Sequence, residues 1–264
     1  FGKRHSASSR DMLTGNMIAC LDEKGQSYLY TVMYYDDHDR VIQRKSNNRL
    51  NGGVEKDYIA YNFIGQPTKH KHIHSAAGKA TQSEVYSYSY DYADRLQTTT
   101  HCLNNGPVMT LVNNEYDELG RLKHNRRNGQ SNLHTNYAYN LRSWTESISS
   151  PLFCETLYYN DTRSNPTNTR YYNGNISGMD WSVNGDKKRG YDFSYDNLSR
   201  LLYADYLENN IRNHNFNTSY NYDKQGNIVS LMRSGNQNTT YGIIDNLTLN
   251  YRGNQLIKVE DTAS

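Results

Sequence analysis

The stretch that decides the fold is Tyr116-Asp117-Glu118-Leu119-Gly120-Arg121-Leu122. A β-hairpin with a three-residue loop needs a left-handed residue at the third loop position, and Gly120 adopts a positive φ without steric cost. The Asp117 side chain can cap such a turn and meet the arginine that follows it, while Tyr116 lies opposite Leu122 across the ladder. The stretch therefore predicts a tight hairpin with one ionic and one apolar face.

The same spacing recurs along the chain at intervals of roughly 20 to 30 residues, which is typical of repeat architectures. The further copies are Tyr35 to Val41, Tyr61 to Pro67, Tyr90 to Leu96, Tyr139 to Thr145, Tyr195 to Leu201, Tyr222 to Ile228 and, in degenerate form, Tyr251 to Ile257. The motif is carried by Tyr35, Asp36, Arg40, Tyr61, Gly65, Tyr90, Asp91, Arg95, Tyr116, Asp117, Gly120, Arg121, Tyr195, Asp196, Arg200, Tyr222, Asp223 and Gly226.

The third loop position holds glycine or aspartate in five copies, and both residue types tolerate a positive φ. Ser143 and Ser199 occupy it in two others, where we expect less regular turns. Between Thr145 and Tyr195 the spacing is blurred, with Tyr159-Asn160 and Tyr172-Asn173-Gly174 as candidate starts.

The composition favours a thin, tyrosine-built sheet. Hydrophobic residues make up 35% of the 264, mean hydropathy is −0.95, and there are 25 tyrosines against five phenylalanines and two tryptophans. Tyrosine buries a large ring and keeps a polar tip, which suits a sheet with a wet edge. No stretch has sustained helical periodicity and no linker interrupts the pattern, so we predict one all-β array over residues 1–264.

Charge and cysteine content exclude several classes. The net charge is +2 with both signs interspersed, which indicates no nucleic-acid partner. Cys20, Cys102 and Cys154 lack the spacing of a zinc site or a disulfide framework and are expected to be small buried hydrophobes. There is no apolar run long enough for a transmembrane helix. Phe1 follows no charged leader, so we expect an internal segment of a longer chain.

Two clusters invite a metal-binding hypothesis. His70, His72 and His74 alternate and would share one strand face, but neighbouring lysines and the absence of a carboxylate in the stretch favour a solvated basic strand. Asp36, Asp37 and Asp39 crowd one turn without the further oxygen ligands of a calcium loop, so turn capping is the better interpretation. We predict no metal and no cofactor.

Catalysis has no motif in its favour, because the fingerprints of hydrolases, metalloproteases and nucleotide-binding enzymes are absent. Carboxylates such as Glu115, Asp117, Asp192 and Asp196 could converge for glycoside hydrolysis, but their spacing does not single out a pair. The sequence therefore predicts no catalytic residue.

The Tyr-Asp-x-x-Gly-Arg-Leu unit resembles the signature of the RHS/YD-repeat family, from Tyr35 to Ile257. The resemblance implies a curved or spiralling antiparallel sheet, an open section of the shell with which family members enclose a toxin or present a cell-surface contact domain. Divergent copies such as Tyr172 to Ile176, leading into Trp181, are similar to RHS-like proteins of gut Bacteroidetes. The family's autoproteolytic core and variable toxic tip have no counterpart in the sequence, so no toxin or catalytic domain is carried over.

These observations favour a non-enzymatic repeat scaffold that serves as an encapsulating shell or contact surface. By resemblance, it would belong to a secreted or cell-surface protein. The implied partners are a C-terminal toxin or core domain of the same polypeptide, or a surface glycan or protein. Two alternatives remain open: a glycan- or protein-binding module that uses a tyrosine-lined face, and a β-fold hydrolase with two carboxylates in a deep pocket.

Overall fold

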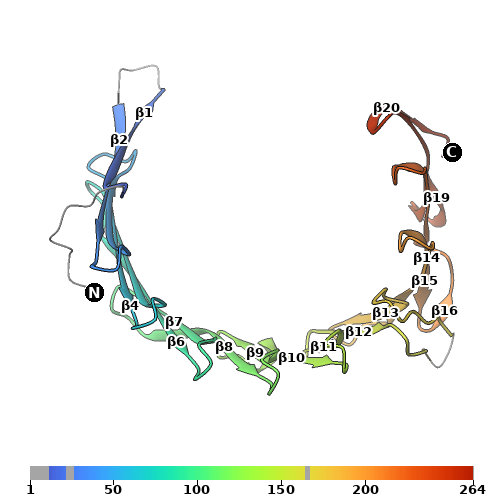
Figure 1. Ribbon diagram of the computed structural model, residues 1–264, viewed down its shortest axis with the longest axis horizontal. Helices are drawn as coiled ribbons and strands as arrows, with labels where there is room; N and C mark the ends of the chain where they lie inside the picture. Colours follow the sequence, from blue (N-terminus) through green and yellow to red (C-terminus); the bar gives the residue numbers. More distant parts are fainter. Residues whose placement is uncertain (1–11, 22–26, 164–166, 264) are drawn as a thin grey trace. The chain divides into compact units, whose positions relative to one another are not determined.

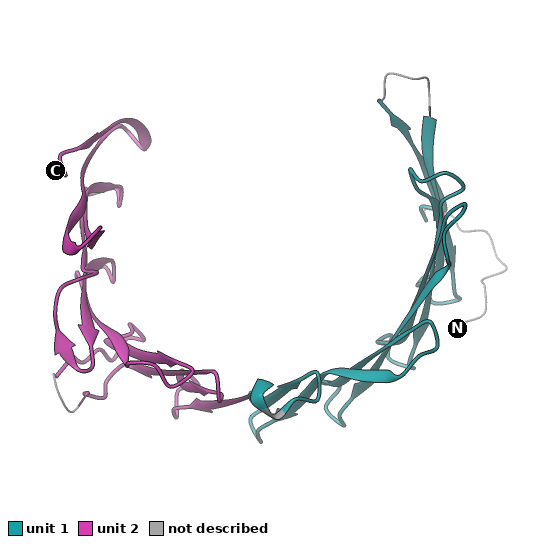
Figure 2. Ribbon diagram, turned by 180° about the vertical axis from the view of Figure 1, so that it is seen from behind, with its two compact units in different colours: residues 1–134 teal, residues 135–264 magenta. Residues whose placement is uncertain are grey.

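The structure, a computed structural model, describes residues 12–21, 27–163 and 167–263. The chain divides into two compact units, residues 1–134 and 135–264, coloured separately in Figure 2. Within each unit the strands are antiparallel and form a curved sheet (Figure 1). The only helix among the described residues is the short 3-10 turn η1 (Ser131–Leu133), so the predicted all-β class is confirmed.

Unit 1 is an antiparallel meander in which each strand pairs with the next along the chain. Its strands are β1 (Gly15–Cys20), β2 (Ser27–Tyr35), β3 (Val41–Asn47), β4 (Val54–Tyr61), β5 (Pro67–Ser75), β6 (Gln82–Tyr90), β7 (Leu96–Leu103), β8 (Val108–Tyr116) and β9 (Leu122–Arg127).

Unit 2 is also an antiparallel sheet in which most strands pair with the next along the chain. One edge of β15 pairs with two strands, β16 and β17. The strands are β10 (His134–Tyr139), which starts at the last residue of unit 1, β11 (Thr145–Ser149), β12 (Phe153–Tyr158), β13 (Gly178–Val183), β14 (Arg189–Tyr195), β15 (Leu201–Glu208), β16 (Ile211–Arg212), β17 (Thr218–Tyr222), β18 (Ile228–Gln237), β19 (Thr240–Arg252) and β20 (Gln255–Asp261).

The predicted hairpin is present in detail at β8–β9. Tyr116 lies opposite Leu122, and Gly120 has a φ of 83°. Asp117 caps the loop, since its Oδ1 accepts the backbone N–H of Leu119 at 3.0 Å and of Arg121 at 2.8 Å. The cap satisfies N–H groups that a three-residue loop leaves without a ladder partner.

The tyrosine-to-aliphatic pairing is confirmed in the other well-formed copies. The observed pairs are Tyr35 with Val41, Tyr90 with Leu96, Tyr195 with Leu201 and Tyr222 with Ile228. Ser143 and Ser199 each have a φ of 62°, the same region as Asp39 and Asp94. The expectation of less regular turns at the two serines is therefore wrong, because the capped loop holds serine in a conformation that it rarely adopts alone.

Two further predictions need correction. Tyr251 lies opposite Leu256 rather than Ile257, because Gly253 and Asn254 form a two-residue loop in place of three. The cysteines are not buried hydrophobes: Cys20 and Cys102 are half-buried and Cys154 is exposed. A sheet one layer thick has few fully enclosed positions, so small residues on its faces stay partly wet.

A cluster of enclosed side chains in unit 2 surrounds the aromatic ring of Tyr206. Tyr206 and Leu207 are each only 2% exposed. The Tyr206 ring makes edge contacts with Tyr191 at 5.4 Å and Phe216 at 5.0 Å between centroids. Such edge-to-face pairs add to the free energy that ring burial contributes. A small aromatic core therefore stabilises β14 and β15.

Candidate functional site

The repeats are joined by a hydrogen bond that recurs along the chain. In four repeats the tyrosine hydroxyl donates to the backbone carbonyl of the residue that closes the preceding hairpin, six places after that hairpin's tyrosine. The bonds run from Tyr61 to Val41 (3.0 Å), Tyr90 to Pro67 (2.8 Å), Tyr116 to Leu96 (2.8 Å) and Tyr222 to Leu201 (2.8 Å). Burial raises the pKa of the Tyr61 and Tyr222 hydroxyls, so they remain protonated donors.

We expect Tyr116→Phe to lower the free energy of unfolding of unit 1 by about 0.5–1.5 kcal/mol, the net contribution of one such hydrogen bond. Urea titration measures it. Tyr92→Phe is the matched control, because Tyr92 sits at a loop tip and is 96% exposed. An equal loss in both variants would mean that the hydroxyl of Tyr116 does not join the repeats.

A second recurring contact is made by the arginine that follows the loop. Arg95 bonds its own turn through Nε to Asp91 Oδ2 at 2.7 Å, and its guanidinium lies 4.5 Å from the ring centroid of Tyr116 in the next repeat. Arg40 over Tyr61 (4.8 Å) and Arg200 over Tyr222 (4.6 Å) repeat this arrangement. Each arginine therefore links a carboxylate in one repeat to an aromatic ring in the next.

The blurred stretch proves to be one repeat split by an insertion. The Tyr159 hydroxyl donates to the Thr145 carbonyl at 3.0 Å, as a repeat tyrosine does, and the Ile176 carbonyl accepts from Tyr195 at 2.9 Å, as a hairpin-closing residue does. Gly174 has the φ of a third loop residue, +97°. Tyr172 is therefore not the repeat tyrosine, and the described residues between β12 and β13 form no strand.

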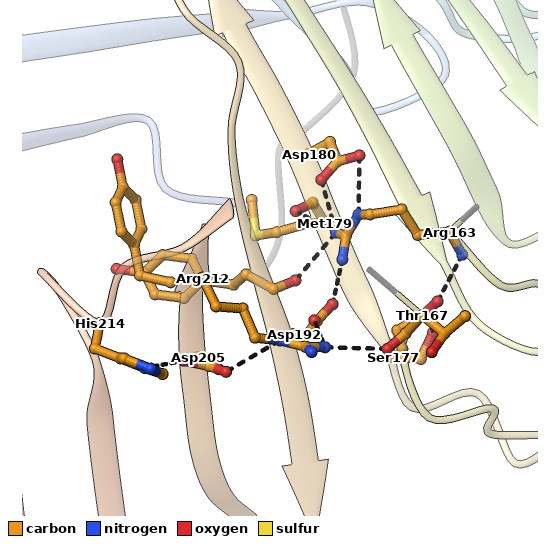
Figure 3. Close-up of polar contacts among 12 residues, drawn as sticks. Arg163, Thr167, Ser177, Met179, Asp180, Asp192, Asp205, Arg212 and His214 are labelled. Atoms are coloured by element: carbon orange, nitrogen blue, oxygen red, sulfur yellow. Dashed lines mark hydrogen bonds and ion pairs between the residues drawn. The ribbon is translucent and has the colours of Figure 1, made fainter. Parts of the chain in front are cut away.

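The insertion carries Arg163, whose side chain is 3% exposed and lies on the sheet face formed by β13 and β14 (Figure 3). Its Nη2 donates to Asp180 Oδ1 at 2.6 Å and its Nη1 donates to Asp192. Nη2 also lies within hydrogen-bonding distance of the carbonyl oxygens of Met179 (3.2 Å) and Tyr191 (3.4 Å). The guanidinium is thus surrounded by acceptors.

Two glycines make room for this guanidinium. Gly178 lies opposite Asp192 and Gly190 lies opposite Asp180, so each carboxylate faces a residue without a side chain. A Cβ on Gly190 would come within 2.5 Å of Asp180 Oδ1, and one on Gly178 within 3.2 Å of Arg163 Nη2. The sequence of these strands is therefore matched to a buried arginine.

A second excursion of the chain, residues 209–217 between β15 and β17, meets the first one. Arg212 donates through Nη2 to Asp192 Oδ2 at 2.6 Å and to the Thr167 carbonyl at 3.0 Å, and its Nε lies 3.2 Å from Asp205 Oδ2. His214 Nδ1 lies 2.8 Å from Asp205 Oδ1 (Figure 3). The network links the two insertions to β14 and β15.

The chemistry of the network is that of a structural anchor. Burial raises the pKa of the Asp180 carboxyl, but hydrogen bonds from Arg163 and from Lys188, whose Nζ is 2.7 Å away, outweigh burial and hold the pKa below its usual value. An ionised carboxylate bound to two cations is a poor proton donor. Asp192 is likewise held by two arginines, and Asp117 and Asp196 cap loops and pair with Arg121 and Arg200.

Unit 1 carries a histidine–carboxylate row that corrects the prediction for His70, His72 and His74. The three side chains do share one face, but Asp57 and Glu55 from β4 lie opposite them. Asp57 Oδ1 lies 3.0 Å from His70 Nε2 and 2.9 Å from His72 Nδ1, and Glu55 Oε1 lies 2.6 Å from His74 Nδ1. The strand is a paired polar row rather than a solvated basic one. Within the described ranges, no histidine, cysteine and carboxylate group has metal-holding geometry.

The row predicts acid sensitivity in unit 1. Burial raises the carboxyl pKa values of Asp57 and Glu55, but hydrogen bonds from the histidines, joined by Arg44 at Asp57 and Asn48 at Glu55, outweigh burial. Both pKa values are lowered from the ordinary 3.8 and 4.5. Stability from a depressed carboxyl pKa is present above the ordinary pKa and lost as pH falls through the lower, folded value. Urea unfolding from pH 5 to pH 2 should show a shallower decline in Asp57→Asn than in the unchanged chain. Identical slopes would exclude Asp57 as a source.

Sequence reasoning located the hairpins but missed the contacts between them. The motif residues of unit 1 and those of unit 2 form two rows of adjacent loops, in which Arg40, Arg95 and Arg200 each reach the following repeat. Arg163 gave no sequence signal as a site, since it stands in a stretch where the repeat spacing fails. The sequence does contain one indication of the buried site. The interrupted repeat holds an arginine, and two Gly-x-Asp triplets follow it at 178–180 and 190–192.

No family model and no curated protein sequence matches the chain. Among solved structures, chains of the TcdB2-TccC3-Cdc42 and TcdB2-TccC3-TEV crystal structures align with 95% and 96% of this chain, each at 10% identity, with TM-scores of 0.33 and 0.34. A porin-like protein from Bacteroides uniformis ATCC 8492 aligns over 76% of this chain and 87% of its own, at 11% identity and a TM-score of 0.25. The chain spans 16% and 17% of the two TcdB2-TccC3 chains. At these scores the backbones do not superpose as a whole.

Proposed function

We propose that the chain is a non-enzymatic scaffold segment of an RHS/YD-repeat protein, exported or held at the cell surface, that serves as an encapsulating shell or contact surface. The observation that carries the proposal is the double link between repeats, tyrosine hydroxyl to carbonyl and arginine to tyrosine ring, which recurs through the array. Links of this kind hold neighbouring hairpins in a fixed register. What such an array provides is a sheet of defined shape. A C-terminal toxin or core domain of the same polypeptide is the partner that the resemblance suggests.

The polar groups support a scaffold over a hydrolase. The carboxylates that could serve catalysis, such as Asp117, Asp192 and Asp196, are bound to arginines, and those arginines are themselves part of turns or of the anchor. A catalytic pair would need one carboxyl with a raised pKa. Every described carboxyl with a resolved pKa shift has its pKa lowered, Asp180 and Asp57 among them.

The tyrosine-lined binding module is the weaker alternative. Recognition by tyrosine uses a free hydroxyl beside an exposed ring. In this chain the repeat hydroxyls of Tyr61, Tyr90, Tyr116 and Tyr222 already donate to backbone carbonyls. At these four motif positions the hydroxyl is therefore engaged within the array rather than offered to a ligand.

A deletion in register tests the scaffold. Removing residues 91–116 joins Tyr90 to Asp117 and regenerates one intact motif. Since each repeat is stabilised through its neighbours, unit 1 should still fold but melt at a lower temperature. Removing residues 91–115 instead shifts the strand by one residue, exchanges its faces and should abolish folding of the unit.

Circular dichroism during heating measures both deletions. Equal melting of the intact chain and the in-register deletion would sink the repeat account. Placement at the surface is tested separately, by antibody labelling of intact against lysed cells that make the full-length protein. Labelling only after lysis would contradict the exported or surface-held assignment.

A further inference from the structure

The Tyr222 repeat lacks the arginine that links three other repeats to the tyrosine that follows them. In the Tyr35, Tyr90 and Tyr195 repeats this arginine contacts its own aspartate at 2.6–2.8 Å and stacks on the next tyrosine. In the Tyr222 repeat the position holds Asn227, whose Nδ2 lies 2.8 Å from Asp223 Oδ2 and 3.5 Å from the Gly253 carbonyl. The asparagine side chain donates to the aspartate of its own turn as the arginines do, but it is too short to cover the ring of the next tyrosine.

The absence of the arginine coincides with an open depression. A cavity of about 610 Å³ lies between this repeat and the next. Asp223 of the first repeat and Tyr251 of the second both line it. The other lining residues include Gln225, Val229, Thr248 and Gly253. The equivalent depression between the Tyr90 and Tyr116 repeats contains Arg95 and measures about 340 Å³. The larger cavity is lined by Gly253, which stands two residues after Tyr251 and has no side chain. The same position of the Tyr116 repeat holds Glu118, which lines the smaller depression.

We propose that this depression is a binding site for a guanidinium group. It presents the two groups that a guanidinium bridges elsewhere in the same chain, the carboxylate of Asp223 and the ring of Tyr251. A planar guanidinium donates to a carboxylate and stacks on an aromatic face, which a compact ammonium does not reproduce. The ligand class is therefore an arginine side chain of a partner polypeptide or a small guanidinium compound.

The charge of the site fits a cation. The hydrogen bond from Asn227 lowers the pKa of the Asp223 carboxyl and outweighs its desolvation, so the carboxylate is ionised at neutral pH. Two nearby cations, Lys224 in the loop and Arg252 at the end of β19, are exposed and do not line the depression. The site therefore offers one anion and one ring without a cation between them.

The test is a titration with Nα-acetyl-arginine methylamide, followed by NMR, with Nα-acetyl-lysine methylamide as comparison. We expect binding on the order of millimolar for the arginine probe and at least about 5-fold weaker binding for the lysine probe. Asn227→Arg places the chain's own guanidinium in the depression and should weaken arginine binding at least about 10-fold. Asn236→Arg adds the same charge at an exposed position of β18 and should leave binding unchanged.

Asp223→Asn and Tyr251→Leu give independent readings if Asn227→Arg does not fold, and each should weaken binding. Undiminished binding in folded Asn227→Arg, or equal binding of the two probes, would overturn the proposal. A Gly/Ser peptide with a single arginine distinguishes the two sources of the ligand. Tighter binding of the peptide than of the free probe assigns the site to a partner polypeptide, and equal binding assigns it to a small guanidinium compound.

Discussion

Replacing Arg163 by methionine is expected to lower the free energy of unfolding of unit 2 by about 3–5 kcal/mol, the usual cost of removing one partner from a buried ion pair. The change removes the guanidinium that bridges Asp180 and Asp192 and leaves each carboxylate with one cation, Lys188 or Arg212. It also releases the insertion from the sheet. Urea unfolding followed by tryptophan fluorescence measures it, because Trp144 and Trp181 both lie in unit 2.

Arg233→Met is the matched control for Arg163→Met. Arg233 pairs with Asp245 at 2.7 Å in the same unit, but its side chain is 51% exposed. Exposed pairs contribute about 0–1 kcal/mol, so the control should change little. If the two variants lose the same stability, the buried network is not the anchor of the insertion.

Gly190→Ala is expected to cost about 1–3 kcal/mol or more, a large effect for one methyl group on a strand. The new Cβ would lie 2.5 Å from Asp180 Oδ1 and 2.7 Å from the Met179 carbonyl, and the second of these atoms is backbone that cannot move aside cheaply. Either the strands separate or Asp180 leaves its position under Arg163.

Gly242→Ala on β19 is the control for this substitution. There the nearest atom is the end of the flexible Gln237 side chain at 2.7 Å, which can rotate away. We expect a change within about 0.5 kcal/mol, and the same fluorescence measurement applies. Equal stability of the Gly190→Ala variant and the unchanged chain would show that the space above Gly190 is not needed.

The hairpins could be predicted because their determinants are local. Tyr116, Asp117, Gly120 and Leu122 stand within seven consecutive residues, and a three-residue loop fixes which of them face each other. The degenerate copy failed for the same reason. The two-residue loop at Gly253 and Asn254 changes the offset by one, and only the loop length decides it.

The contacts between repeats could not be predicted from the motif alone. Whether Arg95 reaches Tyr116 depends on how closely successive loops stack, and that depends on strand pairing over some twenty residues. The motif places an aspartate four residues before the arginine and so suggests an ion pair within one turn. The second role of the arginine appears only when neighbouring turns are placed side by side.

The histidine row was half predictable. Alternation placed His70, His72 and His74 on one face, as observed, but the carboxylates come from another strand. Glu55 and Asp57 alternate in the same way on β4, and the register of β4 against β5 brings the two sets together. A search for complementary alternation in consecutive strands would have found the row from sequence.

The split repeat marks a place where foreign chain can be grafted. The Tyr171 amide donates to the Tyr159 carbonyl at 2.9 Å, so the ends of the inserted segment are held together as closely as strand partners. The Tyr159 hydroxyl and the loop at Gly174 keep the roles that they have in an uninterrupted repeat, although the inserted segment separates them in the sequence. A peptide tag or a small domain with adjacent termini, spliced at the equivalent point of an ordinary repeat, should therefore leave the array intact.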